Sequence, residues 1–242
     1  MARIGIIGSE GRMGEALRRA IAAAGFELAG GADRGDDPAR LADASDALVD
    51  FSAPAALEGT IHAAVGAGVP ILIGTTGLDA VHHAMIDSAA GAIPVLQTGN
   101  TSFGITLLAH LVEEAAARLG QEWDLEVLEM HHRMKVDAPS GTALLLGEAA
   151  AAGRGIALTE HSERGRDGHT GVRAPGAIGF ASLRGGTVAG EHSVILAGEQ
   201  ERIVLSHMAE DRMIFAHGAI RAAAWLIGRA PGRYTMGQVL GL

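Results

Sequence analysis

The segment from Glu129 to Thr142, EMHHRMKVDAPSGT, holds the densest group of ionisable side chains in the sequence. The adjacent His131 and His132 can change charge near neutral pH, and Lys135 is a cation that can transfer a proton if its pKa is lowered. Ser140 is a suitable N-cap for the helix predicted after it, whose first N–H groups can bind a carboxylate. The segment predicts proton transfer beside an anion site. The alternative interpretation is a solvated polar loop before a capped helix.

A glycine-rich turn, Gly8-Ser9-Glu10-Gly11-Arg12-Met13-Gly14, follows the apolar run Ile4–Ile7. Such a turn lets the backbone approach a pyrophosphate, and the N-terminus of the next helix offers N–H groups to it. The spacing G-x-x-G-x-x-G differs from the commoner G-x-G-x-x-G. Asp33, at the end of the second predicted strand, lies where an acid would bind the adenine ribose. The pattern predicts a dinucleotide site.

Two arginines lie beside these residues and bear on the choice of dinucleotide. Arg34 directly follows Asp33, and Arg12 lies within the turn. Guanidinium groups there can bind a 2′-phosphate, so we expect the protein to use both NADH and NADPH. Alternatively, Arg34 is a solvated loop charge.

Strands and helices alternate through the first hundred residues. This alternation predicts an α/β class and a Rossmann-type, doubly wound parallel sheet, which binds ligands at the carboxyl ends of its strands. Two further ends of this kind are residues 74–77 and 98–101. Strands are predicted at 4–7, 26–32, 47–51, 69–73 and 93–96, and helices at 15–24, 55–66 and 78–90.

The pattern changes after residue 102 and predicts a second α+β domain with a mixed or antiparallel sheet. The helical tail, 211–228, is expected to pack on the first domain. We therefore predict a dinucleotide-binding domain at 1–102, completed by 211–242, and a substrate-binding and oligomerisation domain at 103–210. Within the second domain, helices are predicted at 102–119 and 141–152, and strands at 125–130, 177–184, 187–196 and 201–207.

Composition excludes several classes of function. With 242 residues, of which 48% are hydrophobic, the chain can bury a core, and its net charge of −9 argues against nucleic-acid binding. Because cysteine is absent, disulfides, thiolate metal centres and a cysteine nucleophile are excluded. No segment reaches the about 20 apolar residues of a membrane helix. The first apolar run ends at Gly8, unlike a signal peptide, so we expect a cytoplasmic protein without membrane contact.

Zinc is the remaining metal to consider, because the chain has 11 histidines. His131 and His132 are adjacent, so their side chains point to opposite sides of an extended segment. No H-E-x-x-H spacing occurs in the sequence, and His82-His83 are expected on an exposed helix face. No metal site is predicted.

Over essentially its whole length the sequence resembles the 4-hydroxy-tetrahydrodipicolinate reductases, formerly dihydrodipicolinate reductases, of bacterial lysine and diaminopimelate biosynthesis. The run His-His-x-x-Lys-x-Asp-Ala-Pro-Ser-Gly-Thr is highly specific to that family. Met134 stands where many members carry another histidine, and Thr101 where many carry an aromatic residue. The other markers are Gly11–Gly14, Asp50–Ser52, Gly74–Gly77, Arg173–Phe180, Arg184–Gly186 and Gly190–His192.

The resemblance implies reduction of 4-hydroxy-tetrahydrodipicolinate, a small dicarboxylate, to tetrahydrodipicolinate with loss of water, using NADH or NADPH, in a homotetramer built through the second domain's sheet. It makes His131 the proton donor or acceptor and Lys135 a proton donor, and it places His132, Gly141 and Thr142 at the substrate carboxylates. Residues alone do not assign each proton transfer. The cofactor is implied to contact Gly8, Ser9, Glu10, Gly11, Arg12, Met13, Asp33, Arg34, Gly74, Thr75, Thr76, Thr98, Gly99, Asn100 and Thr101.

Two other functions are compatible with a dinucleotide fold. One is a different two-domain dehydrogenase acting on an amino or hydroxy acid, which would not need the run from His131 to Lys135. The other is a nucleotide-sensing protein without chemistry, in which the dinucleotide shifts a conformational equilibrium.

Overall fold

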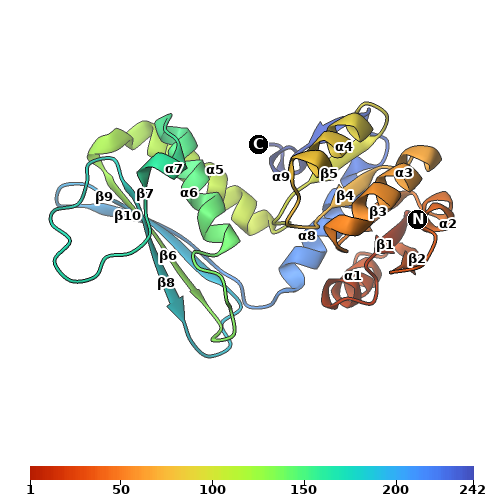
Figure 1. Ribbon diagram of the computed structural model, residues 1–242, viewed down its shortest axis with the longest axis horizontal. Coiled ribbons are helices and arrows are strands. Elements are labelled where there is room, and N and C mark those ends of the chain that lie inside the picture. The colour runs from red at the N-terminus through yellow and green to blue at the C-terminus, as the bar shows by residue number, and fades with distance from the viewer. The chain divides into compact units, whose positions relative to one another are not determined.

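A computed structural model describes residues 1–242, which divide into two compact units (Figure 1). Unit 1 comprises Met1–Phe103 and Met213–Leu242, and unit 2 comprises Gly104–Arg212. The C-terminal segment therefore returns to the unit in which the chain begins. No helix is both long enough and apolar enough to span a bilayer.

Unit 1 contains a six-stranded sheet in the order β11-β5-β4-β3-β1-β2, and every neighbouring pair is parallel. Its inner strands are short, largely buried apolar runs, as expected for a sheet that is covered on both faces. The predicted doubly wound parallel sheet is confirmed. The strands are β1 Arg3–Ile7, β2 Glu27–Ala32, β3 Ala47–Asp50, β4 Ile71–Ile73, β5 Pro94–Gln97 and β11 Gly232–Tyr234.

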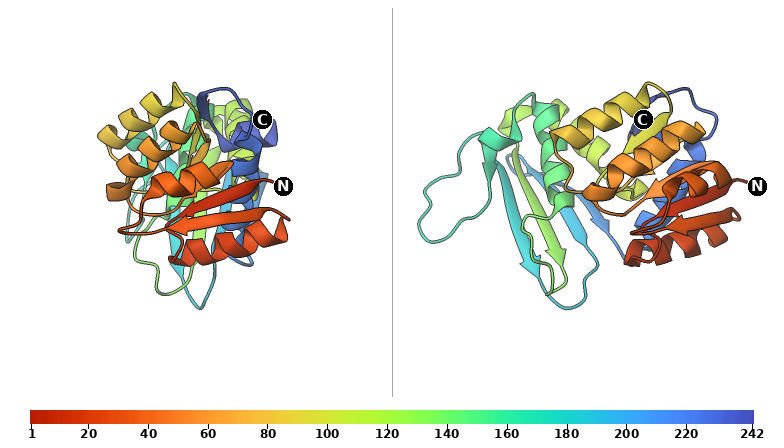
Figure 2. Two further views of the ribbon diagram at one scale, coloured as in Figure 1. Left: turned by 90° about the vertical axis from the view of Figure 1, so that its right-hand side faces the viewer. Right: turned by 45° about the vertical axis from the view of Figure 1, so that its right-hand side comes forward.

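Helices cover both faces of this sheet (Figure 2). The side chains of neighbouring residues in one strand point to opposite faces of the sheet. Ile6 packs with α1 and α8, whereas Ile7 packs in the core that contains α2, α3 and α4. The helices are α1 Arg12–Ala23, α2 Pro38–Ala44, α3 Leu57–Ala67, α4 Ala80–Ala90, α8 Met213–Leu226 and α9 Met236–Leu240, with a 3₁₀ turn at Pro54–Ala56 before α3.

Unit 2 contains a five-stranded mixed sheet in the order β10-β9-β6-β8-β7. β6 runs parallel to β8 and antiparallel to β9, which confirms the predicted mixed sheet. Helices α5 and α6 pack on one face of this sheet through a single core. The elements are α5 Phe103–Leu119, a 3₁₀ turn Gly120–Glu122, β6 Asp124–His131, α6 Gly141–Arg154, α7 Leu158–His161, β7 Ser162–Glu163, β8 Ile178–Arg184, β9 Glu191–Ala197 and β10 Arg202–Met208.

Several short elements were not predicted, namely α2, α7, β7, β11 and α9. Each is too short to show a clear hydrophobic period, although local signals exist for two of them. Asp37 caps α2 by accepting a hydrogen bond from Ala39 N, and Thr235 forms a capping box at α9. Helix α1 begins at Arg12, within the glycine turn, rather than at the predicted Glu15.

Candidate active site

The glycine turn of unit 1 has no room for a side chain at two of its glycines. Gly8 has φ +83°, and a Cβ built on it would lie 2.7 Å from Phe51 O. A Cβ on Gly14 would lie 2.3 Å from Ser9 O. The turn therefore depends on glycine for its own closed shape, which brings backbone to the edge of the sheet as a pyrophosphate cradle requires.

Helix α1 begins in this turn with an N-cap, Gly11, that supplies no side-chain hydrogen bond. The first N–H groups of an α-helix have no intrahelical partner. Arg12 is exposed and Met13 half-buried at these positions, and their N–H groups can donate hydrogen bonds to an anion at the positive end of the helix. The turn fits a phosphate ligand.

Asp33 ties the end of β2 to the turn. Its carboxylate accepts hydrogen bonds from Ser9 Oγ at 2.6 Å and from Glu10 N at 3.1 Å. Arg18 Nη2 donates to the same Ser9 hydroxyl at 3.0 Å. Ser9 is buried, so its predicted contact with the cofactor is limited by these internal partners.

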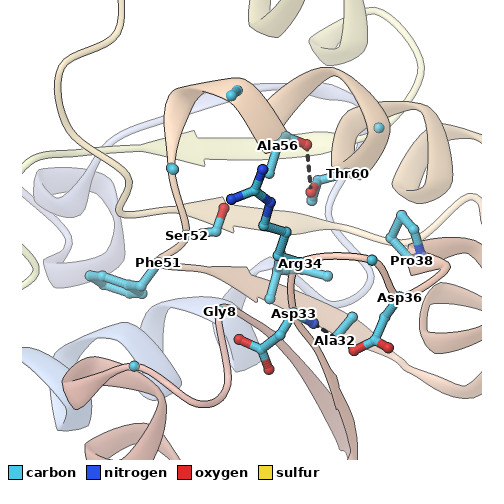
Figure 3. A pocket seen from close by; sticks show the side chains of 16 residues that line it. Gly8, Ala32, Asp33, Arg34, Asp36, Pro38, Phe51, Ser52, Ala56 and Thr60 are labelled. Carbon is cyan, nitrogen blue, oxygen red and sulfur yellow. Dashed lines mark hydrogen bonds between the residues drawn. The ribbon is translucent and has the colours of Figure 1, made fainter.

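A cavity of about 800 Å³ opens at the carboxyl ends of β1, β2 and β3. In Figure 3 the Arg34 guanidinium lies near Ser52 and Ala56, whereas the Asp33 carboxylate is directed toward Gly8. The structure thus brings four predicted residues, Gly8, Gly11, Asp33 and Arg34, to one cavity. Its lining also includes residues that were not predicted, among them Asp36, Pro38, Ala53, Ala55, Gly59 and Thr60.

The loops after β3 and β4 are joined through Asp50, which is completely buried. Its Oδ1 accepts hydrogen bonds from Ser52 N, Ser52 Oγ and Thr75 Oγ1 at 2.6–3.0 Å. Burial raises the pKa of Asp50, against the opposing effect of the Ser52 and Thr75 hydrogen bonds. A Cβ on Gly74 would lie 2.2 Å from the Phe51 ring, so this loop also depends on glycine. The predicted Thr75 is buried, while the neighbouring Thr76 is exposed.

The loop after β5 carries the last predicted cofactor residues. Thr98 Oγ1 donates to Asn100 O at 2.9 Å, and Gly99 is exposed between them. Thr101 is 2% exposed, and its hydroxyl donates to Phe215 O of α8 at 2.6 Å. The Thr101 side chain therefore links this loop to α8. These residues and the loop at 74–76 are not part of the 800 Å³ cavity lining.

In unit 2, the carboxyl end of β6 carries a buried acid–histidine pair. Glu129 is 1% exposed, and its Oε2 lies 2.5 Å from His131 Nδ1. Arg184 of β8 donates from Nη1 and Nη2 to the two carboxylate oxygens at 2.8 and 2.9 Å. Burial raises the pKa of Glu129, but hydrogen bonds from Arg184 and His131 outweigh it and lower the pKa to about 2. The carboxylate is therefore charged at neutral pH.

His192 of β9 packs edge-on against His131, with ring centroids 5.1 Å apart. Its Nε2 lies 3.1 Å from Ser140 Oγ, which also accepts a hydrogen bond from Ala143 N and caps α6. Burial lowers the pKa of His192 to about 4, and the charge of His131 acts in the same direction. Burial also lowers the pKa of His131. Two neutral histidines thus lie beside one charged carboxylate.

The other predicted substrate residues gather at this end of β6. Lys135 Nζ lies 2.8 Å from Asp137 Oδ1, and its hydrogen bond lowers the pKa of Asp137. His132 is half-buried, and its N–H donates to Val188 O. Gly141 and Thr142 form the first turn of α6, which Ser140 caps as predicted. Met134 of the same loop is 77% exposed.

Sequence reasoning did not assign roles to Glu129, Arg184 or His192. A signal exists for two of them. Glu129 and His131 continue the alternation of buried Leu125 and Val127, so this pattern predicts that the Glu129 carboxylate faces the core. His192 similarly continues the buried positions of β9. Arg184 gives no such signal, because its contact depends on the pairing of β6 with β8.

The two units together define a class of protein. A parallel sheet with a glycine turn, joined in one chain to a mixed-sheet unit that carries acid–base residues, is the organisation of a two-domain, nicotinamide-dependent dehydrogenase. No group of three or more potential metal ligands occurs in the structure.

Comparisons with known proteins identify the family. The family models for the N-terminus and C-terminus of dihydrodipicolinate reductase match residues 2–101 and 104–240. The chain is 52% identical to a 4-hydroxy-tetrahydrodipicolinate reductase of Zymomonas mobilis, over 99% of this chain and 97% of that protein. A protein of the same name from Bradyrhizobium diazoefficiens is 50% identical with the same coverage. The chain belongs to the dihydrodipicolinate reductase family.

Solved structures agree on the fold. The dipicolinate-bound dihydrodipicolinate reductase from Paenisporosarcina sp. TG-14 superposes with a TM-score of 0.77 at 21% identity, covering 97% of both chains. A C. glutamicum diaminopimelate dehydrogenase superposes with a TM-score of 0.57 at 15% identity. Family membership confirms the predicted oxidoreductase, its role in lysine and diaminopimelate biosynthesis and its use of a nicotinamide nucleotide. The alternatives of a different dehydrogenase and of a sensor are thereby set aside.

Proposed function

We propose that the chain reduces 4-hydroxy-tetrahydrodipicolinate to tetrahydrodipicolinate with NADH or NADPH and releases water. The observation that carries the mechanism is the arrangement at the end of β6. There His131 and the start of α6 contact the buried carboxylate of Glu129, and the charge of Lys135 acts on His131. Family membership supplies the reaction, and this arrangement supplies groups suited to proton transfer and to binding a dianion.

In unit 1, the pyrophosphate would lie on the N–H groups of the first turn of α1, and Asp33 would accept hydrogen bonds from the adenine ribose. The glycine positions of the turn support this, because they keep side chains away from the backbone at the strand end. The loops at 74–76 and 98–101 follow neighbouring strands and would line the nicotinamide half. The bound dihydronicotinamide supplies the hydride.

Arg34 would bind the 2′-phosphate of NADPH. It lines the cavity together with Asp33, and its guanidinium lies near Ser52 and Ala56 (Figure 3). Arg34 carries no acidic partner among the ion pairs of the structure, so its charge is available to a phosphate. NADH would use the ribose contact to Asp33 instead.

In unit 2, the substrate's carboxylates would bind to His132 and to the first turn of α6 at Gly141 and Thr142. Lys135 would deliver a proton to the ring nitrogen as the hydride arrives, and His131 would exchange a proton during the reaction. Lys135 and Asp137 form an ion pair at the surface of the same loop, which keeps the ammonium near His131. The dipicolinate bound by the Paenisporosarcina protein is itself a dicarboxylate.

We also propose that unit 2 mediates assembly into a cytoplasmic homotetramer. The face of its sheet away from α5 and α6 carries apolar side chains, including Leu183, which is 49% exposed, and Met208, which is 67% exposed. The register sets Leu183 opposite Met130 on β6, and Met208 opposite Glu191 on β9. Exposed apolar side chains of this size on one sheet face support association between copies.

The proposal is tested by following absorbance at 340 nm while the purified protein meets NADPH or NADH. The substrate is generated in place by dihydrodipicolinate synthase from pyruvate and aspartate semialdehyde. Substrate-dependent oxidation of the nucleotide supports the assignment, and the ratio of the two rates gives the cofactor preference. Dinucleotide binding without oxidation by either cofactor would contradict it.

A further inference from the structure

We infer that Glu129 is a positioning residue, which holds the proton of neutral His131 on Nδ1 and leaves Nε2 as the atom that exchanges protons with the substrate. This inference rests on the proposed function in its use of His131. It adds a residue, an atom and a tautomer to that function.

The geometry of the pair carries the inference. Glu129 is 1% exposed, and its Oε2 is 2.5 Å from His131 Nδ1. A carboxylate without a proton can only accept, so Nδ1 must be the donor in this hydrogen bond. A neutral imidazole has one N–H, and placing it on Nδ1 leaves a lone pair on Nε2.

Arg184 holds the Glu129 carboxylate in the position from which it binds His131. Its two terminal nitrogens bind both oxygens of Glu129, and Nη2 also donates to Asp137 O at 2.7 Å. Ser140 N donates to Oε1 of Glu129 at 3.3 Å. The carboxylate therefore has partners from β6, β8 and the start of α6, which prevents it from turning away from His131.

Nε2 of His131 lies close to Gly190, which has no side chain. Gly190, with φ +154°, would place a Cβ 3.0 Å from Nε2, closer than ordinary contacts. Nδ1 is engaged by Glu129 on the other side of the ring. The two nitrogens are thus distinguished by their surroundings, because Nδ1 is bound to a carboxylate and Nε2 lies beside a residue without a side chain.

The charges around His131 give Glu129 a measurable effect. Burial lowers the pKa of His131, Glu129 raises it, and Lys135 and Arg184 lower it. His192 packs on the ring, and its own pKa of about 4 leaves it neutral near pH 7. Replacement of Glu129 by glutamine keeps the side chain's shape but removes the charge that opposes the other three effects.

The experiment is a histidine ¹⁵N–¹H NMR titration of the intact protein, with the His131 signal assigned from its absence in His131→Gln. In the wild type we expect neutral His131 to be the Nδ1–H tautomer. In Glu129→Gln we expect its pKa to fall by about one unit or more. The limb of the kcat/KM pH profile that belongs to His131 should move to lower pH by the same amount, while the KM for the dinucleotide changes little.

Glu126→Gln is the matched control. Glu126 lies on β6 three residues away, is paired with Arg166 and Arg173, and alternation places it on the opposite face of the strand. The Glu126→Gln variant should leave the pKa and tautomer of His131 unchanged. Glu129→Asp, which keeps the charge, should restore part of the pKa lost in Glu129→Gln.

An Nε2–H tautomer in the wild-type protein would overturn the inference, and this measurement needs no variant to fold. An unchanged His131 pKa in folded Glu129→Gln would also overturn it. Because tautomer and pKa are read without turnover, their failure is distinct from failure of the proposed reaction, which would show as no nucleotide oxidation by the wild type.

Discussion

The candidate nucleotide site of unit 1 and the candidate proton-transfer site of unit 2 differ in the groups that form them. At the glycine turn, the backbone forms the site, and missing side chains at Gly8 and Gly14 are its main requirement. At the end of β6, side chains form the site, and a fully buried carboxylate organises them. Under the proposed function, the first site would bind its ligand through fixed N–H groups, and the second would move protons through groups whose charge can change.

This difference gives the two sites different sensitivities. A backbone cradle is altered by steric change and little by pH, because N–H groups do not titrate. A buried network of titratable groups is altered by single charges, because burial strengthens their interactions. Substitutions should therefore separate binding of the nucleotide from turnover.

The largest effect is expected for Lys135→Ala. Loss of a positioned proton donor should lower kcat by about 10² to 10⁴-fold, while the dinucleotide Kd stays within about twofold. Arg133→Ala removes an exposed cation from the same loop and serves as the control, with a kcat near that of the wild type. Steady-state kinetics and fluorescence titration with NADH check both values. Full activity of Lys135→Ala would refute its role.

A smaller effect, on dinucleotide binding rather than on turnover, is expected for Gly14→Ala. The new Cβ would meet Ser9 O at 2.3 Å, so the turn must shift and the dinucleotide Kd should rise by at least about tenfold. Gly66→Ala in α3 is the control, because nothing lies within 4 Å of its new Cβ. That control should keep the Kd and gain up to about 1 kcal/mol of stability. Calorimetric titration and thermal melting distinguish the two variants.

Arg34→Gln should change the choice between nucleotides. Loss of a charged hydrogen bond to a 2′-phosphate, about 1.5–3 kcal/mol, raises the KM for NADPH about tenfold or more and leaves the KM for NADH nearly unchanged. Arg40→Gln, exposed on α2 and outside the cavity lining, is the control. Equal changes in the two KM values would show that Arg34 is a solvated charge without a role in selection.

The smallest effect is a pH dependence of stability. His192 has a folded pKa of about 4, below its ordinary 6.5, so the unfolded chain binds the additional proton between these values. Stability is therefore complete above pH 6.5 and falls as the pH is lowered toward 4. His192→Gln should reduce this slope by up to about 1.4 kcal/mol per pH unit.

Urea unfolding at several pH values measures the slope, with exposed His62→Gln as the control that should retain it. His131 and His207, whose pKa values are also lowered by burial, should maintain a residual slope in the variant. An unaltered slope in His192→Gln would mean that this histidine is not held neutral.

The same contrast explains what the sequence could predict. Elements of unit 1 follow from local patterns, because the run Ile4–Ile7, the glycines and the next amphipathic helix are contiguous. The segment from His131 to Lys135 was found for the same reason. The clamp of Arg184 on Glu129 joins residues 55 positions apart, and β11 joins the sheet from the far end of the chain. Such contacts depend on strand order, which local patterns do not encode.

Amide hydrogen exchange on the intact protein tests the division between the two sites most directly. NADPH alone should slow exchange in the first turn of α1 and in the loop after β2, and dipicolinate alone should slow exchange in the first turn of α6. Protection of the α6 turn by NADPH, with none at residues 8–14, would contradict the account.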